Sequence, residues 1–306
     1  MNKFRFYFIL MFSALVLFSC NKADDTVAEV PLRDYATQYA AEKALIETFM
    51  RTHYRQTVDS PGTTSDMDVS ILPIPAAGGV TSLWDEKKTK TVTRNDVDYE
   101  VHYVEFRNGD PSKEAPSAVD NVLVAYDGLY LRTTEEPKRF EYRPFPEAYI
   151  GLDQVIPAWT EIFQLFKPGT AAPVGAGATA YNDFGAGVMF IPSGVGYYNY
   201  ATATIPSYSS LMFTFKLYDM KRADNDGDGV LSIYEDRNGN GIFTDDDTDG
   251  DGIADYLDTD DDGDGMSTRT EIKNAAGVIY AFDMIPSCSA GGLKRYLDPS
   301  CQGEPK

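Results

Sequence analysis

The sequence predicts an α+β fold in which an antiparallel half-barrel wraps around one short helix. Four segments from Tyr99 onward combine β-type composition with apolar stretches, and turn residues separate them. A single short helical segment, residues 158–166, lies between the second and the third of these strands. Strands that bury one face need a covering layer, and one helix can provide it. The four strand segments are residues 99–106, 122–126, 188–191 and 211–217.

The chain begins with an export signal. Lys3 and Arg5 precede an apolar run, residues 6–18, that is too short to span a bilayer. The run ends in Leu-Phe-Ser-Cys at residues 17–20, which resembles a bacterial lipobox and implies that Cys20 is acylated. A plain secretory signal with a chance cysteine is the alternative. Residues 21–25 resemble the surface-export signal of lipoproteins in the Bacteroidetes phylum, so we expect a lipid-anchored envelope protein, in the outer membrane and facing the periplasm or the surface.

Helical spacing of apolar residues predicts a helix over residues 31–55, which either docks on its own domain or forms a homodimer contact. Residues 56–97 are expected to be irregular, with short apolar pieces that serve as strands or packing arms. The predicted organisation is a signal peptide (1–19), a tether (20–30), a helix with an irregular region (31–97), the half-barrel (98–220), acidic repeats (221–272) and a tail (273–306). The apolar helix positions are Tyr35, Tyr39, Ile46, Phe49 and Met50.

The half-barrel region contains six short motifs, which are Ala-Tyr-Asp-Gly at 125–128, Phe-Glu at 140–141, Val-Ile-Pro-Ala-Trp at 155–159, Ile-Pro-Ser-Gly-Val-Gly-Tyr at 191–197, Ile-Pro-Ser at 205–207 and Leu-Met-Phe at 211–213. In order and spacing these motifs resemble those of FKBP-type peptidyl-prolyl cis–trans isomerases. They cover about two fifths of the chain. Glu141, Ala158 and Tyr198 stand where the family pattern has Asp, Gly and Gly.

This resemblance implies an apolar peptide pocket with Trp159 as its floor. The hydroxyl of Tyr197 and the backbone N–H of Ile156 would bind substrate carbonyls, and Glu141 would complete the catalytic group. The alternatives are that these aromatic residues are simply core, or that the cleft binds peptides without catalysis. The extra segment 170–187 is a substrate flap or, as its Gly/Ala-rich composition favours, a disordered insertion. The implied walls are Tyr126, Phe140, Val155, Ile156, Ile205 and Phe213.

The implied chemistry suits such a pocket. Rotation about an Xaa-Pro bond must cross about 18–20 kcal/mol because the amide loses resonance as it twists. An apolar, water-poor cleft favours the less dipolar twisted amide, so neither a nucleophile nor a cofactor is expected for catalysis. The expected partners are proline-containing segments of envelope or secreted proteins.

The formal net charge of −20 is concentrated in one sixth of the chain. Between Asp224 and Glu271 there are 17 acidic residues and two arginines. A field of this sign attracts cations and repels nucleic acid, and the sequence has no basic patch, so we expect no nucleic-acid partner.

The acidic segment contains four twelve-residue loops of the calcium-binding kind, three with the pattern Asp-x-Asp-x-Asp-Gly and one, loop two, with Asp-x-Asn-x-Asn-Gly. Loop one supplies Asp224, Asp226, Asp228, Val230, Ser232 and Glu235, and loop two supplies Asp236, Asn238, Asn240, Ile242 and Asp247. Loop three supplies Asp247, Asp249, Asp251, Ile253, Asp255 and Asp258, and loop four supplies Asp260, Asp262, Asp264, Met266 and Glu271. Loops one and four are expected to bind best, and loop two, with fewest charges, worst.

Loops placed end to end leave no room for the full flanking helices of an EF-hand pair, so a calcium-triggered opening is not expected. The segment resembles thrombospondin type-3 repeats, in which calcium is structural. A disordered acidic linker is the alternative. In the tail, Cys288 and Cys301 either form a disulfide, as an exported protein permits, or remain free thiols. His53 and His102 receive no role. The functional expectation is a calcium-stabilised envelope isomerase, and the alternative is a non-catalytic peptide-binding or spacer lipoprotein.

Overall fold

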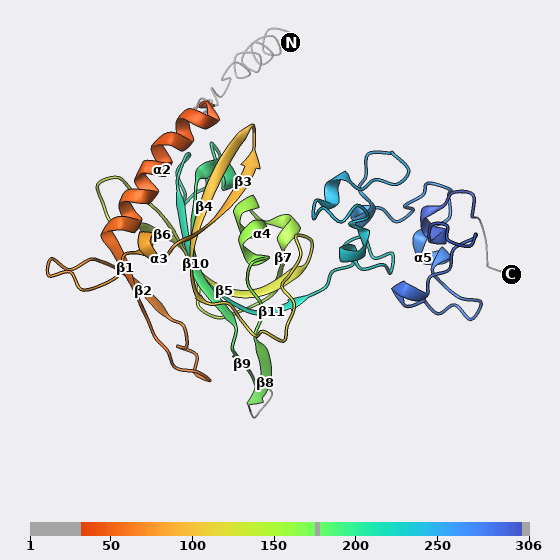
Figure 1. Cartoon of the computed structure of the whole chain (residues 1–306), viewed down its shortest axis with the longest axis horizontal. Coiled ribbons are helices and arrows are strands. Elements are labelled where there is room, and N and C mark those ends of the chain that lie inside the picture. The colour runs from red at the N-terminus through yellow and green to blue at the C-terminus, as the bar shows by residue number, and fades with distance from the viewer. Residues whose placement is uncertain (1–31, 175–177, 302–306) are drawn as a thin grey trace, which may run out of the picture. The chain divides into compact units, whose positions relative to one another are not determined.

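The computed structural model describes residues 32–174 and 178–301, so the export signal, Cys20 and the whole tether (20–30) lie outside the described residues. No helix within these ranges is long and apolar enough to cross a membrane. The predicted α+β fold class is confirmed: a curled antiparallel sheet wraps around the short helix α4 (Figure 1).

The sheet has seven strands in the order β3-β4-β10-β11-β5-β6, with β7 paired to β5. Its neighbours along this order are antiparallel. Helix α4 spans Pro157–Phe163. The strands are β3 (Lys88–Arg94), β4 (Val97–Arg107), β5 (Asn121–Tyr130), β6 (Lys138–Arg143), β7 (Tyr149–Gly151), β10 (Gly185–Ile191) and β11 (Leu211–Lys221).

Strand β10 is buried along its whole length because both faces of the sheet are covered. Met189 and Ile191 belong to the apolar cluster around α4. Val188 and Phe190, which alternate with them, belong to a second cluster on the opposite face, under helix α2 (Tyr35–Thr52). A strand covered on both faces reads as a continuous apolar run, as this one does.

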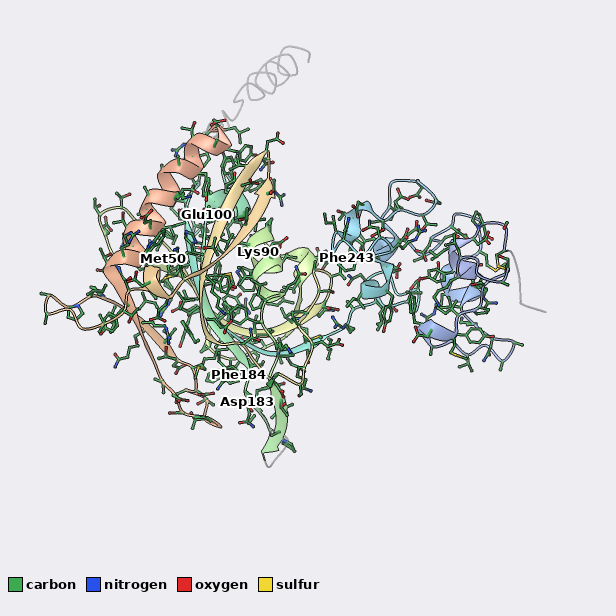
Figure 2. All side chains as sticks on the ribbon, viewed as in Figure 1. Met50, Lys90, Glu100, Asp183, Phe184 and Phe243 are labelled. Carbon is green, nitrogen blue, oxygen red and sulfur yellow. A yellow bond between two sulfur atoms is a disulfide. The ribbon has the colours of Figure 1, made fainter. Side chains whose placement is uncertain are left out.

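Helix α2 packs on its own sheet. It starts at the N-cap Asp34, whose side chain accepts a hydrogen bond from the Thr37 N–H at 2.8 Å. Its buried positions recur every four residues, and Ile46 and Met50 enter the second apolar cluster. Met50 is labelled in Figure 2. The inner face is therefore occupied by the chain itself, and the homodimer contact through residues 31–55 stays a prediction.

The N-terminal half of α2 also forms hydrogen bonds with the segment that precedes Tyr197. The buried carboxylate of Glu42 accepts hydrogen bonds from the backbone N–H of Ser193 at 2.7 Å and from its hydroxyl. The hydroxyl of Tyr198 donates to the carbonyl oxygen of Arg33, and its ring stacks on Tyr35 with centroids 4.2 Å apart. Burial raises the pKa of Glu42.

The region predicted to be irregular, residues 56–97, is largely structured. Strands β1 (His53–Thr57) and β2 (Val69–Pro73) form a hairpin, and a short helix, α3 (Leu83–Glu86), follows. The seven-stranded sheet begins with β3 at Lys88, ten residues before the predicted boundary. Strand β3 was missed because Val92 is its only buried residue, so it carries little apolar signal.

The expectation that segment 170–187 is disordered was wrong for its described parts. Strands β8 (Thr170–Val174) and β9 (Ala178–Asn182) form an antiparallel hairpin, and residues 185–187 already belong to β10. The ring of Tyr181 packs on Tyr218 at 5.2 Å. Backbone pairing with one aromatic anchor supplies order that Gly/Ala-rich composition does not reveal. Figure 2 labels Asp183 and Phe184, which connect the hairpin to β10.

In the described part of the acidic segment and tail, up to residue 301, the helical turns are at most four residues long, and two isolated β-bridges accompany them. Two small apolar clusters support them, and the smaller one includes Val119 of the half-barrel with Phe243 and Tyr256. Cys288 and Cys301 form a disulfide with Cα atoms 5.7 Å apart. The turns are Ser232–Glu235, Phe243–Asp245, Asp255–Leu257, Thr268–Glu271, Phe282–Met284 and Arg295–Leu297.

His102, on β4, provides a test of this packing. Its buried ring lies 2.9 Å from the Thr89 hydroxyl and 3.8 Å from the Glu100 carboxylate. Burial outweighs that carboxylate and lowers the pKa of His102 to about 4. The unfolded state therefore binds this proton more readily, so stability is lost as the pH falls from about 6.5 towards 4.

We predict that this histidine alone removes on the order of 3 kcal/mol of unfolding free energy between pH 7 and pH 4. Urea unfolding at both pH values, compared between the wild type and His102→Gln, isolates its contribution from that of the carboxylates. An identical pH dependence in the two proteins would contradict the prediction.

Candidate functional site

A cavity of about 440 Å³ opens beside the N-terminus of α4. Seven of its ten lining residues are among those implied by the isomerase resemblance. Three others, Ile150, Gln154 and Pro157, were not predicted, and Ile150 lies on β7, which was too short to give a sequence signal. The lining residues are Tyr126, Glu141, Ile150, Gln154, Val155, Ile156, Pro157, Trp159, Tyr197 and Phe213.

Local sequence fixes the position of Trp159. Pro157 is the first helical residue, where its missing N–H costs nothing, and Ile156 is the N-cap. This start places Trp159 in the first turn, with the ring almost completely buried. Its ring packs edge-on against Tyr126 at 5.0 Å and Phe213 at 5.1 Å. The aromatic floor of the cavity is therefore held from two strands and one helix.

The indole N–H of Trp159 is buried and has no hydrogen-bond acceptor among the described residues. A buried donor without a partner costs about 1–3 kcal/mol. The cavity floor thus keeps one unused donor beside its apolar walls.

Tyr126 and Glu141 form the polar side of the cavity. Burial and a hydrogen bond to the Glu141 carboxylate raise the pKa of Tyr126 to about 12. Arg143 donates to Glu141 at 2.8 Å, so the carboxylate is held from a second direction. The longer glutamate therefore still reaches the pocket tyrosine.

Tyr197 lies at the rim of the cavity and is 38 % exposed. Burial raises its pKa, and the negative charge of Glu141 adds to the shift. The hydroxyl therefore stays a neutral donor at physiological pH. The next residue, Tyr198, has φ 50°, which lies in the left-handed region that favours glycine. The family pattern has glycine at this position.

Phe140 and Ile205, two predicted wall residues, do not line the cavity. The ring of Phe140 packs against Phe213 at 5.5 Å, and Ile205 is buried in the core. Phe140 therefore supports the wall residue Phe213 from behind, and Ile205 belongs to the apolar cluster that contains Trp159 and Phe213. Ala158, in the position of a family glycine, is fully buried in the same core.

The four acidic loops share one backbone hydrogen-bond pattern. In each loop the N–H of the sixth-position glycine donates to the first-position aspartate, and every such glycine has a positive φ. The seventh-position N–H donates to the side chain at position five, at 2.6–2.8 Å. The predicted register is therefore the one that the backbone adopts. The donor glycines are Gly229, Gly241, Gly252 and Gly265.

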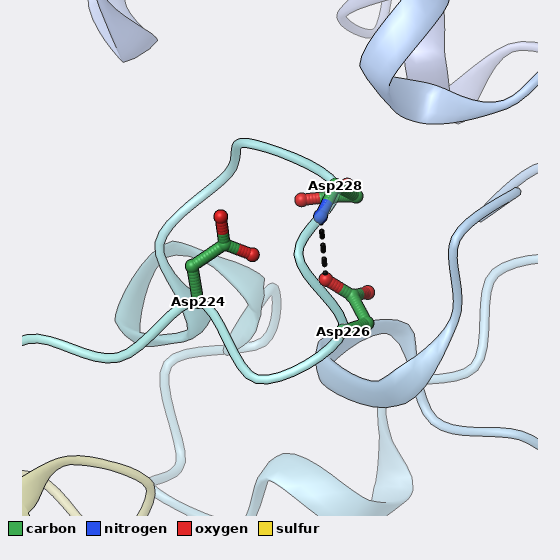
Figure 3. Close-up of side chains that lie close together, drawn as sticks. All are labelled: Asp224, Asp226 and Asp228. Carbon is green, nitrogen blue, oxygen red and sulfur yellow. Dashed lines mark hydrogen bonds between the residues drawn. The ribbon is translucent and has the colours of Figure 1, made fainter.

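Three loops gather three carboxylates each. In loop one, Asp224, Asp226 and Asp228 have one oxygen apiece within 4.8 Å of the others, and the Asp228 N–H donates to Asp226 (Figure 3). Asp247, Asp249 and Asp251 of loop three form an equivalent group, as do Asp260, Asp262 and Asp264 of loop four. Two oxygens that bind one calcium ion at 2.3–2.6 Å lie at most about 5 Å apart, so each group fits one ion.

Loop two differs because asparagines stand at its third and fifth positions. The Asn238 amide donates to Asp245 and Asp246, and the Asn240 amide donates to Asp245 at 2.8 Å. Its polar side chains thus bind one another. This agrees with, but does not test, the expectation that loop two binds a cation least well.

The twelfth-position acids of loops one and four, Glu235 and Glu271, are buried, and neither oxygen of either has a hydrogen-bond partner among the described residues. Burial and neighbouring aspartates raise the pKa of Glu235 to about 10 and that of Glu271 to about 8. A buried carboxylate is costly unless it is paired, and these two have no cationic partner at salt-bridge distance among the described side chains. A hard divalent cation would supply the missing charge.

Ser232 and Asp255, the residues predicted as ninth-position ligands, form hydrogen bonds within their own loops. Ser232 accepts a hydrogen bond from the Asn225 N–H at 3.1 Å, and Asp255 accepts from the Thr248 N–H at 2.7 Å and from its hydroxyl. Both therefore brace position two of their own loops. Asp255 belongs to none of the carboxylate groups found among the described residues, and the ligand roles of Ser232 and Asp255 stay a prediction.

Comparison with known proteins gives partial matches. A family model described as BamM C-terminal matches residues 225–295, which span most of the acidic loops and the tail. None of the curated proteins compared with the chain matches it. The solved structure of FkpA from Escherichia coli is 28% identical over 43% of this chain, with a TM-score of 0.32, and the chain spans about half (51%) of the length of FkpA. A peptidyl-prolyl cis–trans isomerase from Pseudomonas syringae pv. tomato is 17% identical over 63% of this chain and 100% of its own, with a TM-score of 0.36.

Gly128 provides a test of the pocket's packing. A Cβ atom at this position of β5 would lie 2.7 Å from Cζ of Phe140 and 2.8 Å from Cε1 of Phe213. We predict that Gly128→Ala lowers the unfolding free energy by about 1–3 kcal/mol, because both rings must leave their positions. Denaturant unfolding measures the loss. Phe140→Leu, which removes the ring atoms nearest the new methyl group, should recover part of it in the double variant. A wild-type stability for Gly128→Ala would show that the rings are not held as described.

Proposed function

We propose that the chain is an FKBP-type peptidyl-prolyl cis–trans isomerase of the cell envelope whose C-terminal segment is stabilised by calcium. The observation that carries the proposal is the cavity between Trp159, Tyr126, Phe213 and Tyr197, with the N-cap Ile156 at its edge. Most of its lining residues are apolar or aromatic, and its charged lining residue, Glu141, accepts a hydrogen bond from Arg143.

Each residue of the cavity has its own role in the proposed rotation of the Xaa-Pro bond. The proline ring packs on the indole of Trp159, and the apolar walls exclude water, which favours the less dipolar twisted amide. The Tyr197 hydroxyl and the Ile156 N–H hold the flanking carbonyls. Tyr126 positions Glu141. No bond is made to the protein, so selective binding of the twisted amide provides the whole rate enhancement, tenfold for each 1.4 kcal/mol.

An isomerisation assay on an Xaa-Pro peptide tests the proposal. We predict that Tyr197→Phe lowers kcat/KM by up to about tenfold, since one hydrogen bond is worth about 0.5–1.5 kcal/mol. Trp159→Ala removes the floor and is expected to abolish turnover. Tyr200→Phe is the matched control because Tyr200 is close in sequence, 76 % exposed and outside the cavity lining.

Full activity in the combined Tyr197→Phe, Trp159→Ala variant would exclude catalysis at this pocket. A wild type that binds a proline peptide without turning it over would establish the second candidate, a non-catalytic binding lipoprotein. The departures at Glu141, Ala158 and Tyr198 are what favour that candidate.

The calcium part of the proposal rests on the repeated loop register and the unpartnered acids Glu235 and Glu271. We predict that a chelator lowers the melting temperature of the full chain. A site held at 100 times its Kd contributes about 2.7 kcal/mol of stability that removal of the ion abolishes. Calorimetry with and without added calcium measures the shift, and an equal amount of magnesium is the control. An unchanged melt in chelator would argue for loops that need no ion.

The envelope location rests on the lipobox-like residues 17–20 and the disulfide between Cys288 and Cys301, which suits an oxidising compartment. Acylation of Cys20 would anchor the protein to a membrane, the outer membrane by our proposal. Its clients would then be proline-containing segments of envelope or secreted proteins.

A further inference from the structure

One buried carboxylate of the acidic segment lies outside the calcium-loop pattern. Asp261 stands at position two of loop four, where loops one to three have Asn225, Arg237 and Thr248. Position two contributes no ligand in this kind of loop. Asp261 is nevertheless 1 % exposed, the burial of a core residue.

The surroundings of Asp261 satisfy only half of its carboxylate. One oxygen accepts a hydrogen bond from the Thr268 hydroxyl at 2.7 Å. The other, Oδ1, is buried and has no partner among the described residues. No lysine or arginine lies at salt-bridge distance from it in the described part of the chain.

Asp261 faces loop one across more than 20 residues of sequence. Asp228, Glu235 and Asp261 each offer a carboxylate oxygen, and these oxygens lie within 4.8 Å of one another. All three side chains are at most 2 % exposed. Both oxygens of Glu235 and one of Asp228 are, like Oδ1 of Asp261, without a partner among the described residues. Several unpartnered buried oxygens thus converge from two loops.

We propose that Asp261 is a ligand of the cation bound in loop one, so that a single ion ties loop four to loop one. The inference rests on the calcium binding proposed above. The spacing fits, because ligands of one calcium ion lie at most about 5 Å apart. All three groups are carboxylates and none is nitrogen or sulfur, which selects a hard cation such as calcium.

The same geometry explains why loop one has room for an outside ligand. Its own ninth-position residue, Ser232, is fully buried and accepts a hydrogen bond from the Asn225 N–H. Asp261 takes the place that this side chain leaves. The ion then cross-links Glu235 and Asp261. The chain between these two residues, which contains loops two and three, becomes a loop closed by the ion.

Calcium titration of the full chain by calorimetry tests the inference. Asp261→Asn keeps an oxygen that can accept from Thr268 but removes the charge. We expect it to weaken one calcium site at least tenfold and to leave the other sites unchanged. Asp249→Asn, in the exposed group of loop three, is the matched control and should weaken a different site.

A double-variant cycle identifies the site. In an Asp226→Asn background, in which loop one is already impaired, Asp261→Asn should add little. In an Asp249→Asn background its effect should add fully. Full additivity with Asp226→Asn would overturn the inference, as would wild-type calcium affinity in Asp261→Asn.

One further measurement and one control protein distinguish the remaining outcomes. If Asp261→Asn unfolds in chelator, the calcium-loaded chain is titrated instead with a competing fluorescent chelator, which reports the same site affinities. If the wild type binds no calcium, the proposed calcium function fails as a whole. A wild type that binds normally beside an unaffected Asp261→Asn overturns the shared ligand alone.

Discussion

The burial of both faces of one sheet is the constraint on which the half-barrel depends. β10 sends Met189 and Ile191 to the side of α4 and Val188 and Phe190 to the side of α2. Both helices therefore cover apolar residues of the sheet, and each also positions part of the candidate site. α4 carries Trp159 into the cavity, while α2 holds the segment that ends at Tyr197. Core and site are made from the same contacts.

The sequence predicted the half-barrel where its signal was strong, and the signal was burial. Continuous apolar runs located β10 and β11, and the order of the aromatic motifs located seven of the ten cavity residues. β3 was missed because a strand at the sheet edge with one buried valine has almost no apolar pattern. The predicted strand 122–126 ended too early, because Asp127-Gly128 is a typical turn pair, whereas β5 continues to Tyr130. The glycine is needed there because Phe140 and Phe213 pack closely on Gly128, which is a tertiary requirement. Such contacts are invisible to local spacing.

The acidic loops show the opposite balance. Their register could be read completely, because positions one, three, five and six are fixed by short-range backbone hydrogen bonds that recur in all four loops. What could not be read is how the loops meet. The proximity of Asp261 to Glu235 depends on the path of the chain between them, and no periodicity encodes it. The pattern likewise gives Ser232 and Asp255 a position but not a hydrogen-bond partner, and in the structure both accept from position two of their own loops.

Tyr198 links the helix α2 to the pocket at a cost in backbone energy. A non-glycine residue in the left-handed region is strained by roughly 1–2 kcal/mol, and the family pattern avoids this with glycine. Here the side chain offsets the strain by stacking on Tyr35 and donating to the Arg33 carbonyl. Glycine at this position would relieve the backbone but release the start of α2 from the segment that presents Tyr197. Tyr198 therefore costs backbone energy, but its side chain fixes the start of α2 and, with it, the rim of the cavity.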